Sequence, residues 1–271
     1  MLSRSAKRIQ GARSVVWDGK TSGEWARELE GAAAVLNVAG ESVFTHWSDE
    51  EKKTFISSRV DPTKALCQAI QACKDPPAAW VNANAVGYYG DTGDLEADES
   101  SPPGSDFLAN LCKEWEAAQE ECVCPATKKS RVRIGFVLGN EGGALPLLKR
   151  LTALFLGSAT GNGRQWVPWI HVDDLAVVFR LCVDQRLEGP INGVGPSPVT
   201  NSELMTALRK VMHRPWAPNV PKPLLRLGSL VALPPPEVTL ASQRVVSKRL
   251  KGAGFSYKFP RLELALKDLI D

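Results

Sequence analysis

Few side chains in the sequence could transfer a proton, and Tyr88 is the foremost of them. A tyrosine acts as a general acid or base when a nearby cation, for example a lysine one helical turn further along, lowers its pKa. The chain has only three tyrosines, and the residues four positions after them are Thr92, Gly93 and Arg261. Tyr88 therefore needs a cation from elsewhere, and Lys113 is one candidate. Asn84, just upstream, can hydrogen-bond a carbonyl group but cannot relay a proton.

A second group of candidates lies in the segment Gly163–Leu175, which reads GRQWVPWIHVDDL. It contains a cation, indoles and an imidazole, which together could bind a polar, planar substrate. We predict this role for Arg164, Trp166 and His171. His171 also has a structural alternative, because a lone histidine before an acidic pair more often makes hydrogen bonds within the fold.

The six cysteines are interpreted as free thiols. They are scattered along a chain without a signal-peptide segment in front, which is typical of a reducing compartment. We expect a cytoplasmic location, with an organelle left open. Cys122 and Cys124 form a C-x-C pair, but no second pair or histidine follows at the spacing of a zinc site, so no metal is expected.

Composition and charge narrow the class of partner. The chain has 271 residues, 44% of them hydrophobic, with 33 Lys and Arg against 30 Asp and Glu. A net charge of +3 is too balanced to indicate a nucleic-acid or membrane-surface partner. No segment reaches the roughly twenty apolar residues of a membrane span. We expect a small-molecule partner.

Short apolar runs alternate with longer amphipathic stretches, a pattern typical of parallel strands joined by helices. The expected strands are Val15–Trp17, Ala34–Val38, Trp80–Val86 and Val132–Leu138. The expected helices are Asp49–Lys74, Asp106–Glu121, Pro236–Leu250 and Pro260–Ile270. These elements indicate an α/β fold whose ligand crevice lies at the carboxyl ends of its strands.

Three strand ends carry small and polar residues that suit such a crevice. They read AVLNVAGE over Ala34–Glu41, VNANAVGYYGDTG over Val81–Gly93 and RIGFVLGNEGGAL over Arg133–Leu145. A glycine after one strand usually marks only a turn, but three such ends in series favour a ligand-binding edge. After Leu138 the glycine and proline content rises, which indicates a second lobe of loops and helices.

Seven segments spread over the chain carry a resemblance to a known family. They are LSRS at Leu2–Ser5, WDG at Trp17–Gly19, LNVAGES at Leu36–Ser42, AVGYYGD at Ala85–Asp91, WEAA at Trp115–Ala118, GRQWVPWIHVDDL at Gly163–Leu175 and GFSYKFP at Gly254–Pro260. On these segments the sequence resembles the epimerase-family (NAD-dependent epimerase/dehydratase-like) branch of the extended short-chain dehydrogenase/reductases. The resemblance covers essentially the entire chain.

The resemblance implies a Rossmann-like parallel sheet that binds NADP(H), with NAD as the alternative cofactor, and a smaller C-terminal substrate lobe. The corresponding division gives a dinucleotide-binding domain over residues 1–145 and the substrate lobe over 146–271. Within the lobe, a C-terminal domain particular to this branch is expected from about residue 221.

The resemblance also implies which residues contact the cofactor. It places Ser3 and Arg4 at a strand end, where a guanidinium can pair with the 2′-phosphate of NADP and select it over NAD. The alternative for Arg4 is an untethered basic N-terminus, and Arg59 could equally be a solvated helix residue. The other implied contacts are Val38 and Ala39 beside adenosine, Thr54 and Arg59 on the following helix, and Val137 near the nicotinamide.

The sequence departs from the family pattern at two places. The family opens with a strand, a GxxGxxG loop and a helix before its LSR motif, whereas LSR stands here at residues 2–4. Relative to that pattern the chain lacks roughly thirty residues, about one βα unit plus a strand, which leaves the sheet N-terminally incomplete. We expect a truncated gene model or a misplaced start codon, and the alternative is a natural protein built without its first βαβ unit. Nucleotide binding is expected to require this unit, whose backbone amides hold the pyrophosphate. In the second departure, Asn82 and Asn84 replace serines of the family's SASAVGYYG.

The expected function is that of an NADP(H)-binding, epimerase- or reductase-like protein whose substrate the sequence does not name. In a redox reaction, hydride would pass between the nicotinamide and a carbonyl or hydroxyl group held near Asn84 and Tyr88. The alternative is a non-catalytic cofactor sensor or scaffold on the same fold. The missing Tyr-x-x-x-Lys pair favours the sensor, and the retained crevice motifs favour the enzyme.

Overall fold

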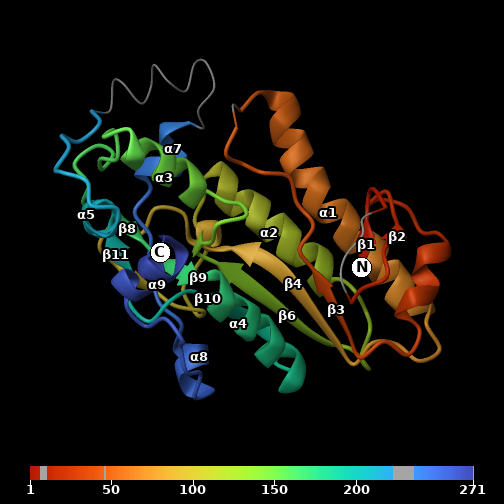
Figure 1. The fold of residues 1–271 in the computed structure, drawn as a ribbon. Helices are drawn as coiled ribbons and strands as arrows, with labels where there is room; N and C mark the ends of the chain where they lie inside the picture. Colours follow the sequence, from red (N-terminus) through yellow and green to blue (C-terminus); the bar gives the residue numbers. More distant parts are fainter. Residues whose placement is uncertain (7–10, 46, 222–234, 271) are drawn as a thin grey trace.

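The central sheet is parallel, as the sequence predicts, and lies between two helical layers in the computed structural model (Figure 1). The structure describes residues 1–6, 11–45, 47–221 and 235–270. Four strands pair in the spatial order β10, β6, β4, β3. Their bounds are Gly189–Gly193 for β10, Lys128–Ile134 for β6, Ala79–Ala85 for β4 and Ala34–Asn37 for β3. The predicted α/β class is confirmed.

Two long helices cover one face of the sheet, and both begin at side-chain caps. Ser48 accepts a hydrogen bond from the Glu51 amide in a capping box at the start of α1, Asp49–Ala72. Asp106 caps α2, Phe107–Glu120, by accepting a hydrogen bond from the Ala109 amide. Both predicted helices are confirmed apart from small differences at their ends. The opposite face is covered by α4, Val172–Asp184, which packs against β4 (Figure 1).

The strand β3 is less covered than its neighbours. A short pair, β1 (Leu2–Ser3) and β2 (Val15–Val16), lies beside it, but within the described residues neither strand hydrogen-bonds to β3. Leu36 is 52% exposed and Val38, just beyond the strand, 71%. In β4, by contrast, every residue before Ala85 is buried. The part of the sheet around β4 and β6 is therefore buried and is called the closed side, and the lateral edge formed by β3 is exposed and is called the open side.

The predicted strand Val132–Leu138 is interrupted at Gly135. A side chain there would place its Cβ 2.3 Å from the carbonyl oxygen of Pro168, so only glycine allows this close approach. After the break, β7 (Phe136–Leu138) leaves the sheet and pairs in parallel with β9 (Trp169–His171). The single-strand prediction was therefore wrong at this point.

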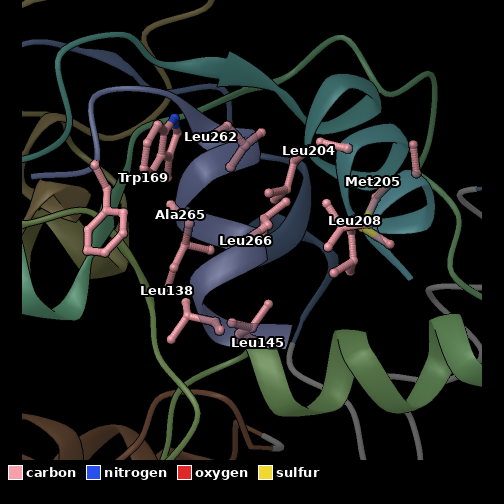
Figure 2. Close-up of a cluster of buried hydrophobic side chains, with 14 residues drawn as sticks. Leu138, Leu145, Trp169, Leu204, Met205, Leu208, Leu262, Ala265 and Leu266 are labelled. Atoms are coloured by element: carbon pink, nitrogen blue, oxygen red, sulfur yellow. The ribbon is translucent and has the colours of Figure 1, made fainter. Parts of the chain in front are cut away.

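A second apolar core surrounds one C-terminal helix and includes Leu138 and Leu145 from earlier in the chain (Figure 2). Its central helix α9, Leu262–Ile270, places Leu262, Ala265 and Leu266 in that core, and the predicted helix over Pro260–Ile270 is confirmed. The predicted helix over Pro236–Leu250 is wrong. That stretch forms α7 (Pro236–Leu240), β12 (Arg244–Val245) and the start of α8 (Lys248–Gly252), because Arg244 and Val245 pair with a distant strand.

The remaining elements are short and connect these layers. They are η1 (Glu24–Leu29), η2 (Val86–Tyr89), β5 (Glu96–Ala97), α3 (Leu145–Ala153), β8 (Trp166–Val167), β11 (Val199–Thr200) and α5 (Asn201–Val211). The expected start of the C-terminal domain, near residue 221, adjoins residues 222–234, which lie outside the described residues. In the described ranges no helix is both long and apolar enough to cross a membrane.

One disulfide corrects the prediction that all cysteines are free thiols. Cys67 on α1 is bonded to Cys122, which follows α2, with their Cα atoms 5.6 Å apart. The two helix ends meet only in the folded chain, so the residues' separation of 55 positions gave no local signal. The other four cysteines are free. Within the part of the chain that is described, no cluster of His, Cys, Asp and Glu could hold a metal ion.

Candidate functional site

The carboxyl ends of β3, β4 and β6 point to one edge, as parallel strands must. The N-terminal strand pair reaches the same edge, because Arg4, directly after β1, pairs with Glu41 across 2.7 Å between Nη1 and Oε1. Glu41 belongs to the loop that follows β3 and also contains Ala39. The structure therefore brings Arg4 next to the loop that contains Ala39, and Ser3 directly precedes Arg4 at the end of β1.

Arg59, on α1, holds the loop after β3 in place by hydrogen bonds. Its Nη2 donates to the carbonyl oxygen of Glu41 at 2.8 Å, and its Nη1 donates to that of Phe55 at 3.0 Å. The guanidinium also lies over the Trp115 ring, and burial lowers the pKa of Arg59. Arg59 is thus a support for the loop and not a solvated helix residue. Thr54 is exposed, and its hydroxyl donates back to the Glu50 carbonyl oxygen at 3.0 Å.

The edge near β3 presents one exposed apolar side chain and one exposed cation. Val38 offers a 71% exposed apolar surface, and the Arg4 side chain is a 76% exposed cation. A Cβ at Gly40 would come within 3.1 Å of the Arg59 guanidinium, so the loop backbone lies directly on its support. No GxGxxG motif occurs in the sequence to hold a pyrophosphate.

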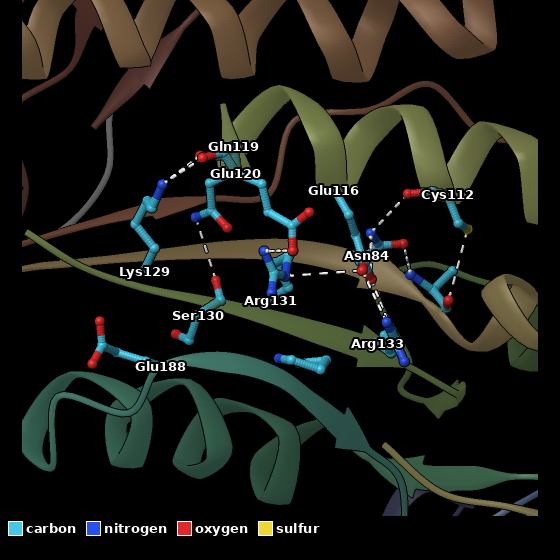
Figure 3. A network of polar contacts seen from close by, with 12 residues as sticks. Asn84, Cys112, Glu116, Gln119, Glu120, Lys129, Ser130, Arg131, Arg133 and Glu188 are labelled. Carbon is cyan, nitrogen blue, oxygen red and sulfur yellow. Dashed lines mark hydrogen bonds and ion pairs between the residues drawn. The ribbon is translucent and has the colours of Figure 1, made fainter. Parts of the chain in front are cut away.

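The other end of the edge carries Tyr88 in η2. A buried ion pair between Arg133 and Glu116 lies at the same end (Figure 3). Arg133 on β6 donates through Nε and Nη2 to the two carboxylate oxygens of Glu116 on α2, at 2.8 and 2.9 Å. The guanidinium carbon lies 3.4 Å from the centre of the Tyr88 ring. The cation next to Tyr88 is therefore Arg133. Lys113, the cation considered from the sequence, makes no hydrogen bond or ion pair within the described ranges.

Asn84 is committed to this buried ion pair (Figure 3). Its side-chain nitrogen donates to Glu116 Oε1 at 3.1 Å and to the Cys112 carbonyl oxygen at 3.3 Å. Its side-chain oxygen accepts from the Ala85 amide at 2.7 Å. Asn84 is therefore buried and hydrogen-bonded to Glu116 and the Cys112 carbonyl group, whereas a substrate contact was expected from the sequence.

Burial shapes the titration of the groups around the ion pair. It raises the pKa of Tyr89 to about 12, and together with the charge of Glu116 it raises the pKa of Cys112 to about 12. Burial alone would lower the pKa of Arg133, but the hydrogen bonds and charge of Glu116 outweigh it and raise that pKa. The guanidinium thus stays charged, and the Cys112 thiol stays protonated.

The three predicted substrate residues are not gathered at one point. Arg164 is exposed, while the indole Nε1 of Trp166 donates to Asp94 at 2.9 Å. His171 is buried as the N-cap of α4: its Nδ1 accepts from the Asp173 amide at 3.1 Å, and its Nε2 lies 3.4 Å from an Asp268 carboxylate oxygen. His171 therefore makes hydrogen bonds within the fold, which is the structural alternative considered from the sequence. Val137 lies on β7, just past the end of β6.

Sequence reasoning missed Glu116 and Arg133. A signal for each was present: Glu116 follows Cys112 by one helical turn on the buried stripe of α2, and Arg133 is one of several cations at alternate positions of a central strand. Charged residues at such positions are rarely buried unless paired. Which partner each one finds depends on how α2 lies over β6, and the sequence does not specify this.

Known proteins share this fold over nearly its whole length. The structure resembles the crystal structure of human epimerase family protein SDR39U1 (isoform 2) with NADPH, with a TM-score of 0.87, 32% identity and coverage of 99% of this chain and 89% of that one. A UDP-N-acetylglucosamine 4-epimerase from Bacillus cereus shares the fold at 17% identity and a TM-score of 0.75. The Rossmann-like expectation is confirmed, and the fold is that of the extended short-chain dehydrogenase/reductases.

Sequence relatives narrow this class. The chain is 34% identical over 268 residues to human epimerase family protein SDR39U1, covering 97% of this chain and 89% of the human protein. It is 38% identical over 258 residues to the chloroplastic SDR39U1 homologue of Arabidopsis thaliana, covering 91% and 71%. Residues 220–269 match a family model described as a domain of unknown function (DUF1731). The chain belongs to the SDR39U1 epimerase family, which confirms the family predicted from its motifs.

Proposed function

We propose that the chain is an NADP(H)-binding, epimerase- or reductase-like enzyme that acts on a small carbonyl or hydroxyl compound. The observation that carries the proposal is the arrangement of the crevice edge, with the exposed Arg4 cation beside the β3 loop and Tyr88 beyond β4. The human relative whose structure contains NADPH supports the choice of cofactor. NAD is the alternative cofactor, as found in more distant neighbours of this fold.

We assign the cofactor contacts along the edge. Ser3 and Arg4 would hold the 2′-phosphate, since a guanidinium matches phosphate oxygens. Val38 and Ala39 would line the adenosine, with Thr54 at the rim and Arg59 fixing the loop. Val137 would lie toward the nicotinamide. The pyrophosphate would need the backbone amides of a glycine-rich loop, which the titration described below adds as an extra unit.

The reacting groups would lie near Tyr88. NADPH, when bound, supplies a hydride to a carbonyl carbon. Tyr88 would donate its hydroxyl proton to the carbonyl oxygen, and Asn84 would act indirectly by holding Glu116. Arg164, Trp166 and His171 remain our proposal for the substrate side, with His171 acting as a support for the lobe. The division into residues 1–145 and 146–271 also remains a proposal.

We further propose that the protein acts in the cytoplasm or in an organelle. The chloroplastic relative in Arabidopsis thaliana supports the organelle. A fluorescent fusion with extra sequence ahead of Met1, compared with one without it, tests this choice. Secretion of both fusions would contradict it.

NADPH binding tests the proposed function most simply. The nicotinamide fluorescence is followed as NADPH is titrated into this chain and into a version carrying a glycine-rich strand–loop–helix unit before Met1. We expect the extended version to bind at submillimolar concentration. Arg4→Ala should weaken NADPH binding about ten- to a hundredfold, the value of a charged hydrogen-bonded contact, and leave NADH binding unchanged.

Arg13→Ala is the matched control for that titration. Arg13 is an equally exposed arginine paired with Glu28, away from the β3 loop, so its replacement should leave NADPH binding unchanged. If neither version of the chain binds NADPH, the proposed function fails. Binding with no turnover of any carbonyl compound in a screen would instead favour the sensor or scaffold.

A further inference from the structure

Two adjacent tyrosines at the crevice edge have opposite surroundings. Tyr89 is buried, and its hydroxyl both donates to Asn192 Oδ1 at 2.7 Å and accepts from Arg133 Nη1 at 2.9 Å. Tyr88 is half-buried, and its hydroxyl has no hydrogen-bond partner within the described ranges. The two rings meet edge to face, 5.3 Å apart. The Tyr89 hydroxyl is therefore occupied within the fold, and the Tyr88 hydroxyl is left for a ligand.

Strand pairing fixes the position of Arg133 next to the rings of Tyr88 and Tyr89. In the strand register Arg133 on β6 stands opposite Asn84 on β4 and opposite Asn192 on β10. These three polar side chains form one rung near the carboxyl ends of the strands. Glu116 from α2 joins the rung through Asn84 and Arg133 (Figure 3). The position of the guanidinium is thus fixed by three strands and a helix.

The contacts of Arg133 also fix the orientation of its plane. Its Nε and Nη2 donate to the Glu116 carboxylate, and its Nη1 donates to the Tyr89 hydroxyl. These hydrogen bonds involve the N–H groups at the edge of the guanidinium, so its flat face is free to stack on a ring. The guanidinium carbon lies 3.4 Å from the centre of the Tyr88 ring. A cation over an aromatic face is attracted to it, most strongly where water is excluded. Arg133 is only 3% exposed.

Resting on the proposed role of Tyr88 as proton donor, we propose that Arg133, clamped by Glu116, is the positioning residue for Tyr88. It supplies through the ring face the positive charge that a lysine supplies in a Tyr-x-x-x-Lys pair. When the substrate carbonyl carbon accepts a hydride, the O–H bond of Tyr88 breaks and its proton goes to the carbonyl oxygen. The resulting phenolate is stabilised by the guanidinium, and water returns the proton.

Chemical reactivity of Tyr88 tests this clamp without a substrate. N-acetylimidazole acetylates a tyrosine oxygen and releases imidazole, and the rate follows the nucleophilicity of that oxygen. The test variant combines Arg133→Met with Glu116→Gln, because the glutamine keeps an acceptor for Asn84 and leaves no unpaired buried charge. We expect acetylation of Tyr88, measured by mass spectrometry, to slow about fivefold in this variant.

The matched control combines Arg131→Met with Glu120→Gln. Arg131 lies on the same strand and pairs with Glu120 at 2.6 Å, and its Nε lies 3.9 Å from Glu116 Oε2. Unlike the test variant, the control therefore leaves Arg133, Glu116 and their hydrogen bonds to each other in place while removing a neighbouring buried cation. We expect unchanged acetylation of Tyr88 in this control. A merely structural Arg133 would give the opposite sign in the test variant, since loosening η2 would expose Tyr88 and speed acetylation. Equal or faster acetylation in the test variant overturns the proposal.

Tyrosine NMR provides a second readout. With three tyrosines in the chain, ring-¹³C labelling gives three sets of signals, and Tyr88→Phe assigns one of them. We expect the Tyr88 signal to move in the Arg133 test variant and to stay in place in the Arg131 control. An unmoved Tyr88 signal overturns the clamp even if NADPH binds. Failure of NADPH to bind overturns the proposed function and leaves this readout intact.

Discussion

The two sides of the central sheet differ in how completely they are covered. Strands β4 and β6 lie between α2 and α4, and they hold a buried ion pair at their carboxyl ends. Strand β3, at the other side, exposes Leu36 and has no further strand partner within the residues described. Stability is therefore concentrated on the closed β4–β6 side, whereas the open β3 side offers exposed groups to a ligand.

The largest expected effect comes from breaking the ion pair on the closed side. Glu116→Ala leaves the Arg133 charge buried without its partner, which costs about 3–5 kcal/mol of unfolding free energy. Glu114→Ala on the same helix is the control, since Glu114 is exposed and makes no ion pair within the described residues. It should change stability by less than about 1 kcal/mol. Urea unfolding measures both, and equal losses would contradict the contrast between buried and exposed carboxylates.

A matched pair of leucines sharpens the comparison of the two sides. Leu111 on α2 is buried in the core of the closed side, so Leu111→Ala should cost about 2–5 kcal/mol. Leu36 on β3 is largely exposed, and Leu36→Ala should stay within about 0.5 kcal/mol. Both changes in unfolding free energy are calculated from the urea midpoints of wild type and variant, using the same dependence of free energy on urea concentration. A large loss from Leu36→Ala would mean that the β3 side is as well packed as the β4 side.

A smaller effect is expected when pH is lowered. Burial lowers the pKa of His171, and it outweighs the raising influence of Asp173, Asp268 and Asp174. Below the ordinary histidine pKa, the unfolded chain binds a proton that the folded chain does not. The contribution of His171 to stability is therefore present above about pH 6.5 and declines as the pH falls below it.

His171→Asn isolates that contribution. Asparagine can still cap α4 but does not titrate, so the loss of stability between pH 7.5 and pH 5.5 should be smaller in the variant than in the wild type. Urea unfolding at the two pH values measures the difference. An identical pH dependence in both proteins would show that His171 is not held neutral by burial.

Elements with local signals were predictable from the sequence. Ser48 and Asp106 are residue types that often cap helices, and they mark the starts of α1 and α2. The parallel α/β class follows from the alternation of strands and helices. Features set by distant contacts were not predictable: Gly135 interrupts a strand because Pro168 lies against it, and residues 244–245 form a strand because β5 is beside them.

The candidate site shows the same limit. The assignment of Tyr88 as proton donor stays a prediction, and its need for a nearby cation followed from chemistry. The identity of that cation could not be deduced, because Arg133 reaches Tyr88 only through strand pairing and the position of α2. Asn84 was expected to contact the substrate, but its side-chain amide donates to Glu116. This contact also depends on the position of α2 and could not be deduced from the sequence.

A crystal structure of the protein with NADPH, in the extended version if that alone binds, tests the central claim most directly. The account predicts the 2′-phosphate within hydrogen-bonding distance of Arg4 and the nicotinamide directed toward Tyr88 and Val137. NADPH bound on another surface, with the edge formed by β3, β4 and β6 empty, would contradict it.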